Sequence, residues 1–240
     1  MSEKTHILVV DDEPQITRVL RTTLSAEGYE TRVANDGEMA LEIMRDWQPH
    51  VIVTDLAMPN LDGVGLCRRI RAFSQVPIIV LSVRNQERQK IEALDAGADD
   101  YMTKPFSSNE LMARIRAHLR RTPKQQAEVQ FLGVGDFRID LNTRVVTVRG
   151  REVKLTPKEF DLLVYLAKSP GRVLTHRSLL ASVWGGTSTQ QPEYLHVFIN
   201  HLRKKLEPED GSIRYIFTEK WVGYRFEPGE EQESSATPSV

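Results

Sequence analysis

The chain has very little cysteine and no long hydrophobic run. Cys67 is the single cysteine among 240 residues, which excludes an intramolecular disulfide and leaves any metal site with one thiolate at most. No apolar stretch approaches the roughly 20 residues that a membrane-spanning helix needs. The first ten residues, MSEKTHILVV, lack the basic segment, apolar core and cleavage site of a signal peptide. We therefore expect a cytoplasmic protein without a membrane partner.

An excess of one sign of charge is also lacking. The 32 Lys and Arg residues nearly balance the 33 Asp and Glu residues, so the formal net charge is -1 at pH 7. The balance nevertheless shifts along the chain, from 16 basic and 18 acidic residues in 1–123 to 15 basic and 11 acidic residues in 130–229. The second half, with its net charge of +4, is therefore the half suited to a polyanion.

The first half alternates short apolar runs with segments of helical period. Between the runs, apolar residues recur three or four positions apart, as they do in an amphipathic helix. This alternation predicts an α/β domain over residues 1–120, with a five-stranded parallel sheet in the doubly wound, flavodoxin-like arrangement and five helices. The predicted strands are residues 6–10, 31–34, 50–54, 77–82 and 100–104.

The second half has a different pattern. Residues 121–132 contain a proline and a polar stretch, and they are predicted to be a linker. Residues 133–229 begin with alternating strands, continue with helical patterns that start near residues 156, 175 and 192, and end with an alternating pair. This order predicts an α+β winged-helix domain. The polar residues 230–240 are predicted to be a disordered tail.

Polar residues gather at the carboxyl ends of the predicted parallel strands, the edge at which open α/β sheets bind ligands. They are Asp11 and Asp12 after the first strand, Asp55 after the third, Ser82 in the fourth and Lys104 in the fifth. Two bare carboxylates about 4 Å apart would repel by roughly 4 kcal/mol in a surface-like dielectric, so the cluster should hold a cation. Oxygen ligands without histidine favour Mg²⁺ over a transition metal.

Each of these residues also has an ordinary structural interpretation. The acids before Pro14 can simply start a helix, Asp55 can cap the turn into the next helix, and Lys104 can be solvated surface. The convergence of all five on one sheet edge is what favours a site over these alternatives.

Several motifs resemble those of a known family. LVVDDEP, VTDLAMPNLDG, IIVLS and ADDYMTKPF resemble the response-regulator receiver domain, and TPKEFDLLVYL, GRVLTHRSLL, HLRKKLE and VGYRF resemble the winged-helix domain of the OmpR/PhoB type. The resemblance covers nearly the whole chain. It implies a two-component response regulator that a sensor histidine kinase phosphorylates on Asp55, and that then dimerises and binds promoter DNA to regulate transcription, with RNA polymerase as a further partner. The stretches VPIIVLS and YLHVFINHLRKKLE resemble regulators of a potassium-uptake operon.

The resemblance also implies roles at the strand edge. The implied Mg²⁺ ligands are Asp11, Asp12, Asp55 and the backbone carbonyl of Ala57. Lys104 is expected to contact a phosphate oxygen, and the Lys104-Pro105 peptide bond is expected to be cis. Ser82 and Tyr101 are expected to form the switch that carries the signal outward. On spacing alone, Tyr101 is equally well an ordinary half-buried strand aromatic.

Two neighbours should set the lifetime of the phosphoryl group. In the family, the second residue after the acceptor and the second after the Ser or Thr flank the attacking water, and here they are Ala57 and Arg84. Ala57 has no group to orient a water and Arg84 can shield the phosphate, so we expect slow self-hydrolysis.

Two other classes of function compete with this interpretation. A Mg²⁺-dependent phosphatase with Asp55 as nucleophile would want a general acid at position 57, and Ala57 cannot serve. The chain is therefore not expected to be an enzyme, apart from catalysing its own phosphorylation and dephosphorylation. A phosphorylation-independent regulator, whose receiver only dimerises, is disfavoured because the strand-edge residues are all intact.

The last helical pattern of the first half carries a charged stripe. Glu110, Arg114 and Arg121 fall within about 40° of one another at 100° per residue. Such a stripe is usually only solvated, but the resemblance implies a dimer interface. The pairs expected across it are Glu110 with Lys90, Arg114 with Asp95, and Arg121 with Asp100.

The helical pattern over 192–206 has one apolar face and one mixed polar face. The polar face suits a DNA major groove, where amides read adenine and cations meet phosphates or guanine; a merely solvated face is the alternative. The candidate DNA-binding residues are Val197, Asn200, His201, Arg203, Lys204 and, in the final hairpin or wing, Lys220. Trp221 stands where the family usually has a small residue, which is a departure from its pattern.

Overall fold

The computed structural model describes residues 4–83, 87–119, 131–185 and 192–229. The chain divides into two compact units, Met1–Arg121 and Thr122–Val240, and each unit is described by itself. Residues 121–130 of the predicted linker and the predicted tail, 230–240, lie outside the described residues. Within the described residues, no helix is both long enough and apolar enough to span a membrane.

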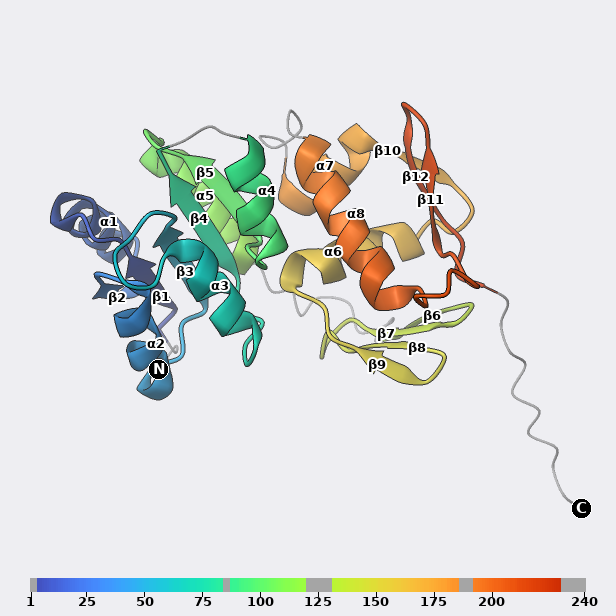
Figure 1. Ribbon diagram of the computed structural model, residues 1–240, viewed down its shortest axis with the longest axis horizontal. Coiled ribbons are helices and arrows are strands. Elements are labelled where there is room, and N and C mark those ends of the chain that lie inside the picture. Colours follow the sequence, from blue (N-terminus) through green and yellow to red (C-terminus); the bar gives the residue numbers. More distant parts are fainter. Residues whose placement is uncertain (1–3, 84–86, 120–130, 186–191, 230–240) are drawn as a thin grey trace, which may run out of the picture. The chain divides into compact units, whose positions relative to one another are not determined.

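The first unit is a five-stranded parallel sheet with helices on both faces, as predicted (Figure 1). The strand order is β2-β1-β3-β4-β5. The strands are β1 (His6–Val10), β2 (Glu30–Ala34), β3 (Val51–Asp55), β4 (Ile78–Ser82) and β5 (Asp100–Thr103). The helices are α1 (Pro14–Ala26), α2 (Gly37–Asp46), α3 (Gly63–Arg71), α4 (Glu87–Asp95) and α5 (Ser108–Leu119).

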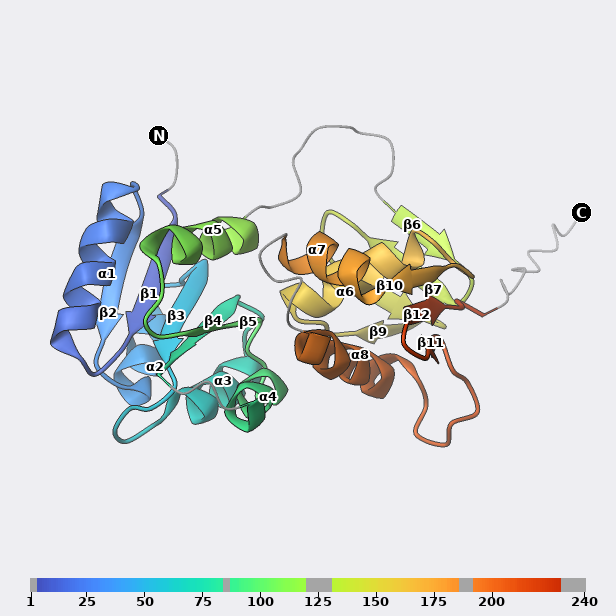
Figure 2. The ribbon, with the colours of Figure 1, turned by 90° about the horizontal axis from the view of Figure 1, so that it is seen from above.

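Helices cover both faces of this sheet. Figure 2 shows α1 and α5 on one face and α2, α3 and α4 on the other. On the α1 and α5 side, Val9, Val53 and Leu81 of the central strands pack in one core with Leu24 and Ile115 of those helices. Because successive residues of a strand point to opposite faces and both faces are covered, the central strands are apolar at nearly every position. Apart from His6 at the start of β1, the polar side chains of these strands lie at their carboxyl ends.

In residues 131–185 and 192–229, the second unit contains two antiparallel sheets and three helices (Figure 1). One sheet is β6-β7-β8-β9 and the other is β10-β12-β11. The strands are β6 (Phe131–Val134), β7 (Phe137–Asp140), β8 (Val146–Val148), β9 (Arg151–Val153), β10 (Val173–Thr175), β11 (Ile216–Glu219) and β12 (Gly223–Phe226). The helices are α6 (Pro157–Ala167), α7 (His176–Trp184) and α8 (Pro192–Leu206). Three helices followed by a hairpin are the predicted winged-helix order.

Two strands of the second unit differ from the sequence prediction. β6 begins at Phe131, inside the range predicted as linker, because Phe131–Val134 pairs with Phe137–Asp140 across a turn in which Gly135 has φ of +52°. β10 was not predicted. It has only three residues, and its partner, β12, lies about fifty residues later in the chain, so no local alternation signals it.

Candidate functional site

The predicted acidic cluster is present at the carboxyl edge of the first sheet. Asp55 is the last residue of β3, and Asp11 and Asp12 follow β1 directly. One carboxylate oxygen from each lies within 4.8 Å of the others. Asp11 and Asp55 are 2% and 4% exposed, whereas Asp12 is exposed. Two of the three charges are therefore held out of water, which is costly without a compensating cation.

These acids do not act as helix caps. Helix α3 is capped by Asp62, whose side chain accepts from Gly65 N, and not by Asp55. At the start of α1, Glu13 occupies the N-cap position and makes no side-chain cap bond. The capping interpretation of Asp55 therefore fails.

The loop after Asp55 folds back on the end of its strand. Gly63 N donates to Leu56 O at 2.9 Å, and a Cβ atom on Gly63 would lie only 2.2 Å from the backbone oxygen of Asp55. No side chain fits there, so glycine is required for this close return. Ala57 is exposed within this loop.

Lys104 joins the cluster from the loop after β5. Its ammonium lies 2.8 Å from Asp11 Oδ2 and 3.4 Å from Asp55 Oδ1, and its side chain is 8% exposed. Its backbone N donates to Ser82 O at 2.7 Å, and the Lys104-Pro105 peptide bond is cis, as predicted. Lys104 also lies 3.5 Å from the exposed Glu13, so the carboxylates outnumber the single ammonium, and the three acids that could hold a metal offer only oxygen ligands. The residues therefore fit a hard divalent cation.

The electrostatics of the cluster depend on burial. Desolvation raises the pKa of Asp55 above its usual value, and the positive charge of Lys104 only partly offsets this. For Lys104, burial disfavours the ammonium, but the hydrogen bond to Asp11 and the charge of Asp55 outweigh it and raise the pKa. At neutral pH the amine therefore stays charged and faces the carboxylates.

The two predicted switch residues are in contact. Ser82 ends β4 and is 3% exposed, and the Tyr101 side chain on the neighbouring strand β5 makes a hydrogen bond with it. Burial raises the pKa of the Tyr101 phenol. The hydrogen bond with Ser82 lowers this pKa in part, and the nearby negative charge of Asp55 raises it further. Tyr101 is 3% exposed. A hydroxyl beside the acidic cluster is thus linked directly to an aromatic ring on the neighbouring strand.

The charged residues predicted for a dimer interface pair partly within the chain. Arg114 Nη1 lies 2.8 Å and 3.0 Å from the two carboxylate oxygens of Asp100, and Nη2 lies 2.8 Å from Glu110. The expected partners of Arg114 and Glu110 were Asp95 and Lys90 of a second copy. Lys90 lies on α4 and Asp95 is its last residue. Arg121 lies outside the described residues.

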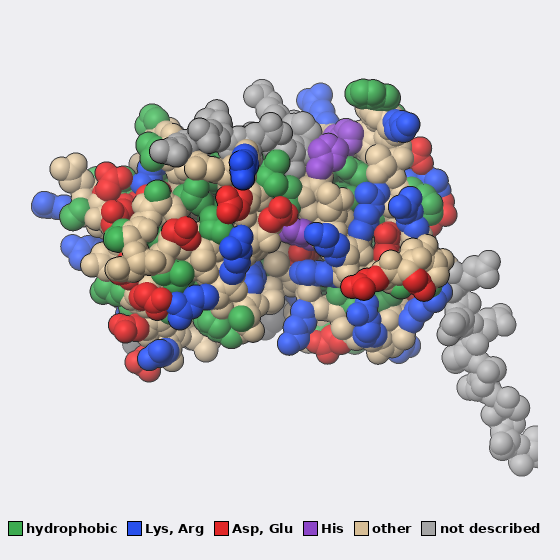
Figure 3. Space-filling view, viewed as in Figure 1, with side chains coloured by type: hydrophobic (Ala, Val, Ile, Leu, Met, Phe, Trp, Pro, Cys, Tyr) green, Lys and Arg blue, Asp and Glu red, His purple; other side chains and the backbone are tan. Residues whose placement is uncertain are grey.

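The polar face of α8 is narrower than predicted. Asn200 and Lys204 are exposed, as is His196, and Figure 3 shows Lys and Arg side chains along α8 and the β11–β12 hairpin, mixed with acidic ones. Val197 lies beside Asn200 and Lys204 in helical angle but is 7% exposed. In the wing, Lys220 is exposed between β11 and β12. The exposed residues form a short stripe at intervals of four.

Two predicted DNA-binding residues are engaged inside the second unit. Arg203 donates from Nη2 to Ile216 O at 2.9 Å and to Thr218 Oγ1 at 2.8 Å, so it braces β11 against α8. His201 Nδ1 lies 3.5 Å from Glu159 Oε1. Periodicity could not distinguish these side chains from free ones, because both lie at the border between the apolar and polar faces.

Sequence reasoning missed the role of Lys205. Its ammonium lies 2.6 Å from Glu159 Oε2, and Glu159 is 1% exposed. Glu159 also accepts from Thr156 N at 2.7 Å, which completes a capping box at the start of α6. The Thr-Pro-Lys-Glu sequence at residues 156–159 signals the capping box, but it does not signal the ammonium partner 46 residues away.

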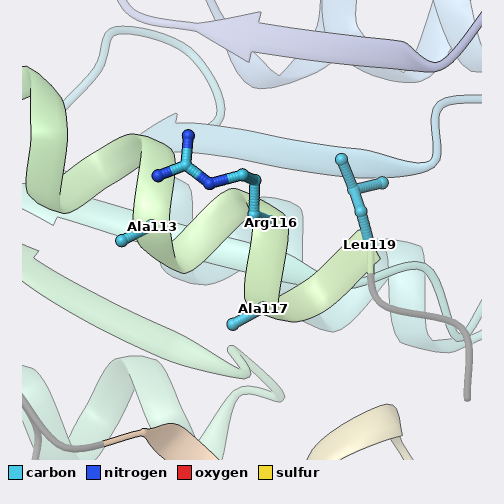
Figure 4. A pocket seen from close by; sticks show the side chains of 4 residues that line it. All are labelled: Ala113, Arg116, Ala117 and Leu119. Atoms are coloured by element: carbon cyan, nitrogen blue, oxygen red, sulfur yellow. The ribbon is translucent and has the colours of Figure 1, made fainter.

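A shallow hollow on α5 is separate from the acidic cluster. It is lined by Ala113, Arg116, Ala117 and Leu119, all on one helix (Figure 4). None of the strand-edge residues lines it, and small apolar side chains and one exposed arginine offer little to bind a ligand.

Comparisons with known proteins follow the division into two units. The family described as response regulator receiver domain matches residues 7–116, and the family described as transcriptional regulatory protein, C terminal, matches residues 150–226. The KDP operon transcriptional regulatory protein KdpE of Escherichia coli is 43% identical over 222 residues, covering 92% of this chain and 99% of that protein. The DNA-binding response regulator MtrA of Mycolicibacterium smegmatis is 40% identical over 222 residues, covering 92% and 96%.

Solved structures agree with the sequence relatives. A mutant of RitR aligns over 94% of this chain and 100% of its own, with a TM-score of 0.74 and 27% identity. DrrB of Thermotoga maritima, an OmpR/PhoB homologue, aligns over 94% and 100% with a TM-score of 0.50 and 30% identity. Both proteins match along both units of the chain.

Proposed function

The chain belongs to the response regulators that join a receiver domain to a DNA-binding domain and regulate transcription, and we propose that Asp55 is the phosphoryl acceptor that controls it. The observation that carries this proposal is the strand-edge cluster. Asp55 ends a buried strand, caps no helix, and lies 3.4 Å from an ammonium that is itself tied to Asp11. A carboxylate held in this way is suited to react rather than to stabilise a turn.

The proposed cofactor is Mg²⁺. Asp11, Asp12 and Asp55 supply the carboxylates that would hold it, together with the backbone carbonyl of Ala57. A bound Mg²⁺ ion supplies positive charge that neutralises the oxygens of a phosphoryl group during transfer. The excess of carboxylates over the one ammonium supports a divalent ion over a monovalent one.

The proposed reaction takes a phosphoryl group from a phosphohistidine of a sensor histidine kinase. An oxygen of Asp55 attacks phosphorus, the new O–P bond forms as the P–N bond breaks, and the electron pair stays on the imidazole nitrogen. Lys104 binds a phosphate oxygen and offsets its charge. The Ser82 hydroxyl donates a hydrogen bond to an oxygen of the acyl phosphate. Tyr101, which is hydrogen-bonded to Ser82 before phosphorylation, repositions its ring behind the moved hydroxyl.

The proposed output is DNA binding by a homodimer. Phosphorylated receivers pair through α4, β5 and α5, and two winged helices then occupy paired half-sites on promoter DNA, where RNA polymerase is a further partner. The second domain carries a net charge of only +4 over 130–229, so one copy should bind weakly and in a salt-sensitive manner. The chain has no further enzymatic activity in this proposal, since Ala57 supplies no general acid.

We also propose a potassium-uptake operon as the regulated target. The KDP operon regulator of Escherichia coli, at 43% identity, supports it, but an MtrA response regulator at 40% identity is nearly as similar. Selection of oligonucleotides by the phosphorylated protein tests this assignment. Recovery of a sequence unrelated to the promoter of such an operon would reject the target and leave the switch intact.

The switch itself is tested with a small acyl-phosphate donor and Mg²⁺. The wild-type chain should gain one phosphoryl group by mass, and its affinity for DNA should rise. Asp55→Asn should gain none, whereas the matched control Asp46→Asn, at an exposed position on α2, should behave as wild type. Phosphorylation that persists in Asp55→Asn would reject the acceptor assignment.

A further inference from the structure

Trp221 at the tip of the wing is unfavourable for folding in two respects, the exposure of its side chain and the conformation of its backbone. Its side chain is 97% exposed, so the indole gains nothing from burial. Its backbone has φ of +65°, in the left-handed region that bulky residues rarely adopt. The turn has Val222 N donating to Glu219 O at 3.0 Å, which makes Trp221 the third of four residues, the position where such turns normally use Gly or Asn. Folding alone does not account for tryptophan here.

The hairpin that presents Trp221 is fixed to the rest of its unit. Arg203 of α8 holds β11 through Ile216 O and Thr218 Oγ1. On the other side, His176 N at the start of α7 donates to Val222 O at 3.1 Å. The tip therefore projects from a hairpin that is hydrogen-bonded to both helices (Figure 1), and Arg203 links it to α8, the helix that carries the exposed stripe. An indole displayed in this way loses little freedom on binding.

The charges around the tip indicate which partner it suits. Lys220 is exposed next to Trp221, and Glu219, the acid at the start of the turn, lies 2.9 Å from Arg225, which also pairs with Glu227. Val222, 47% exposed, extends the apolar surface. An apolar tip beside an exposed lysine matches a groove with apolar sugar walls and phosphates along its edges. The minor groove of duplex DNA has these properties, and apolar wedges enter it in several architectural proteins.

We propose that Trp221 is an apolar wedge that enters the DNA minor groove beside the major groove occupied by α8, and that it selects sites by their deformability. The proposal rests on the DNA binding proposed above. Partial insertion of the indole favours base steps that unstack easily, such as TA and CA/TG. Sequence preference at the wing would then come from the flexibility of the DNA, with Lys220 contacting the flanking phosphates.

The test uses the full-length chain, phosphorylated with a small acyl-phosphate donor, and a duplex selected by the wild-type protein from a random pool. Trp221→Gly should lower affinity about tenfold or more, as loss of a base-stacking aromatic does, without loss of thermal stability, because glycine relieves the backbone strain. Trp221→Phe should restore part of the affinity. Val173→Ala, at another exposed apolar position of the same sheet, is the matched control and should bind as wild type.

Salt dependence separates the wedge from a charge contact. Trp221→Gly should leave the slope of log affinity against log salt unchanged, since no phosphate contact is lost. Lys220→Ala should reduce that slope by about one. Replacing a TA step opposite the wing by a stiff A-tract should weaken wild-type binding and leave Trp221→Gly unaffected.

Tryptophan fluorescence reports on the contact directly. The other two tryptophans, Trp47 and Trp184, are 6% and 4% exposed, so acrylamide should quench chiefly Trp221. DNA should protect this emission in the wild type, and Trp221→Phe should lack the protected component. If DNA binds but Trp221 stays fully quenchable, the wedge is rejected while the DNA-binding function stands. Protection that depends on protein concentration without DNA would instead assign the tip to contact between copies and reject the wedge. No DNA binding by the phosphorylated wild type would reject both proposals.

Discussion

Arg114 Nη1 lies 2.8 Å and 3.0 Å from the two carboxylate oxygens of Asp100 within one chain. Both side chains are buried, at 6% and 3% exposure. Removing one member of a buried pair leaves the other charge uncompensated. The contact therefore makes Arg114 a structural residue of the receiver as well as a candidate for the dimer interface.

Arg114→Ala is expected to destabilise the receiver by roughly 3 kcal/mol, because the buried Asp100 would lose its two-pronged contact with the guanidinium. The Tyr101 N–H at 2.8 Å and the His118 ring at 3.7 Å would remain beside the carboxylate. Urea unfolding of the full chain, followed at the receiver transition, measures this. Arg116→Ala is the matched control on the same helix. Arg116 lies 3.9 Å from Glu27 and is 55% exposed, so its loss should cost less than about 0.5 kcal/mol. An equal loss of stability in the two variants would show that the buried pair with Asp100 stabilises the receiver no more than the exposed contact of Arg116 with Glu27 does.

Asp95→Lys tests the dimer interface at an exposed position, since Asp95 is the last residue of α4 and its side chain is solvent-accessible. We expect it to abolish phosphorylation-dependent dimerisation, because it would place a cation opposite Arg114 of the second copy. Sedimentation of phosphorylated protein decides the matter, and dimerisation that is unchanged in Asp95→Lys would reject this pairing.

Ala57 is expected to prolong the phosphorylated state. It is exposed two residues after Asp55 and has no polar group to orient a water. Ala57→Asn should therefore speed self-hydrolysis by roughly tenfold or more, as a positioned polar group does for an attacking water. Loss of phosphoprotein with time, measured by mass, checks this, and a wild-type half-life of only seconds would contradict it. Arg84, the expected shield, lies outside the described residues.

His176 predicts a pH dependence in the second unit. Burial and the positive charge of a protonated His196 lower the pKa of His176, and its ring packs edge-on against His196 and Tyr224. Because the unfolded chain then binds the proton more tightly, stability should fall as pH drops below the ordinary value near 6.5 and level off below the lowered pKa. His176→Gln should flatten this part of the profile in thermal unfolding. An unchanged profile would assign the dependence to other groups.

Much of the fold and of the acidic cluster follows from sequence pattern. Apolar runs without alternation predict buried parallel strands, and the carboxyl ends of parallel strands share one edge. The sequence therefore predicts that Asp11, Asp55 and Lys104 lie close together, although Asp11 and Lys104 are 93 positions apart in the chain. Nothing but backbone topology is needed for that step.

The parts that pattern could not predict depend on side-chain direction at the borders of helices. Arg114 falls on the charged stripe of α5, and its turn toward Asp100 is a choice of rotamer that no spacing rule reveals. Likewise, Arg203 looks like a groove cation in a helical wheel but binds Ile216 O. Long flexible cations are the residues for which periodicity is least informative, because their heads can reach either face.

The adjacent lysines of α8, Lys204 and Lys205, have different roles that helical periodicity cannot tell apart. Lys204 is exposed, whereas Lys205 bonds to the buried carboxylate of Glu159 at 2.6 Å. Burial alone would raise the pKa of Glu159, but hydrogen bonds with His201 and Lys205 outweigh it and lower the pKa. This group therefore contributes stability above the ordinary carboxyl value, and that stability is lost as pH falls through the lowered pKa.

Lys205→Met should accordingly destabilise the second unit by roughly 1–2 kcal/mol at neutral pH, since a buried carboxylate loses a charged hydrogen bond. The acid unfolding of this variant should begin at higher pH than that of the wild type.

Lys204→Met should leave unfolding unchanged but weaken binding to cognate and scrambled DNA alike, because a phosphate contact carries no sequence information. Asn200→Ala, by contrast, should relax preference at one base. Thermal unfolding and DNA titration of the three variants separate these roles. If Lys204→Met and Lys205→Met lost stability and affinity to the same extent, the two lysines would be equivalent solvated charges and the buried Glu159 would need no ammonium.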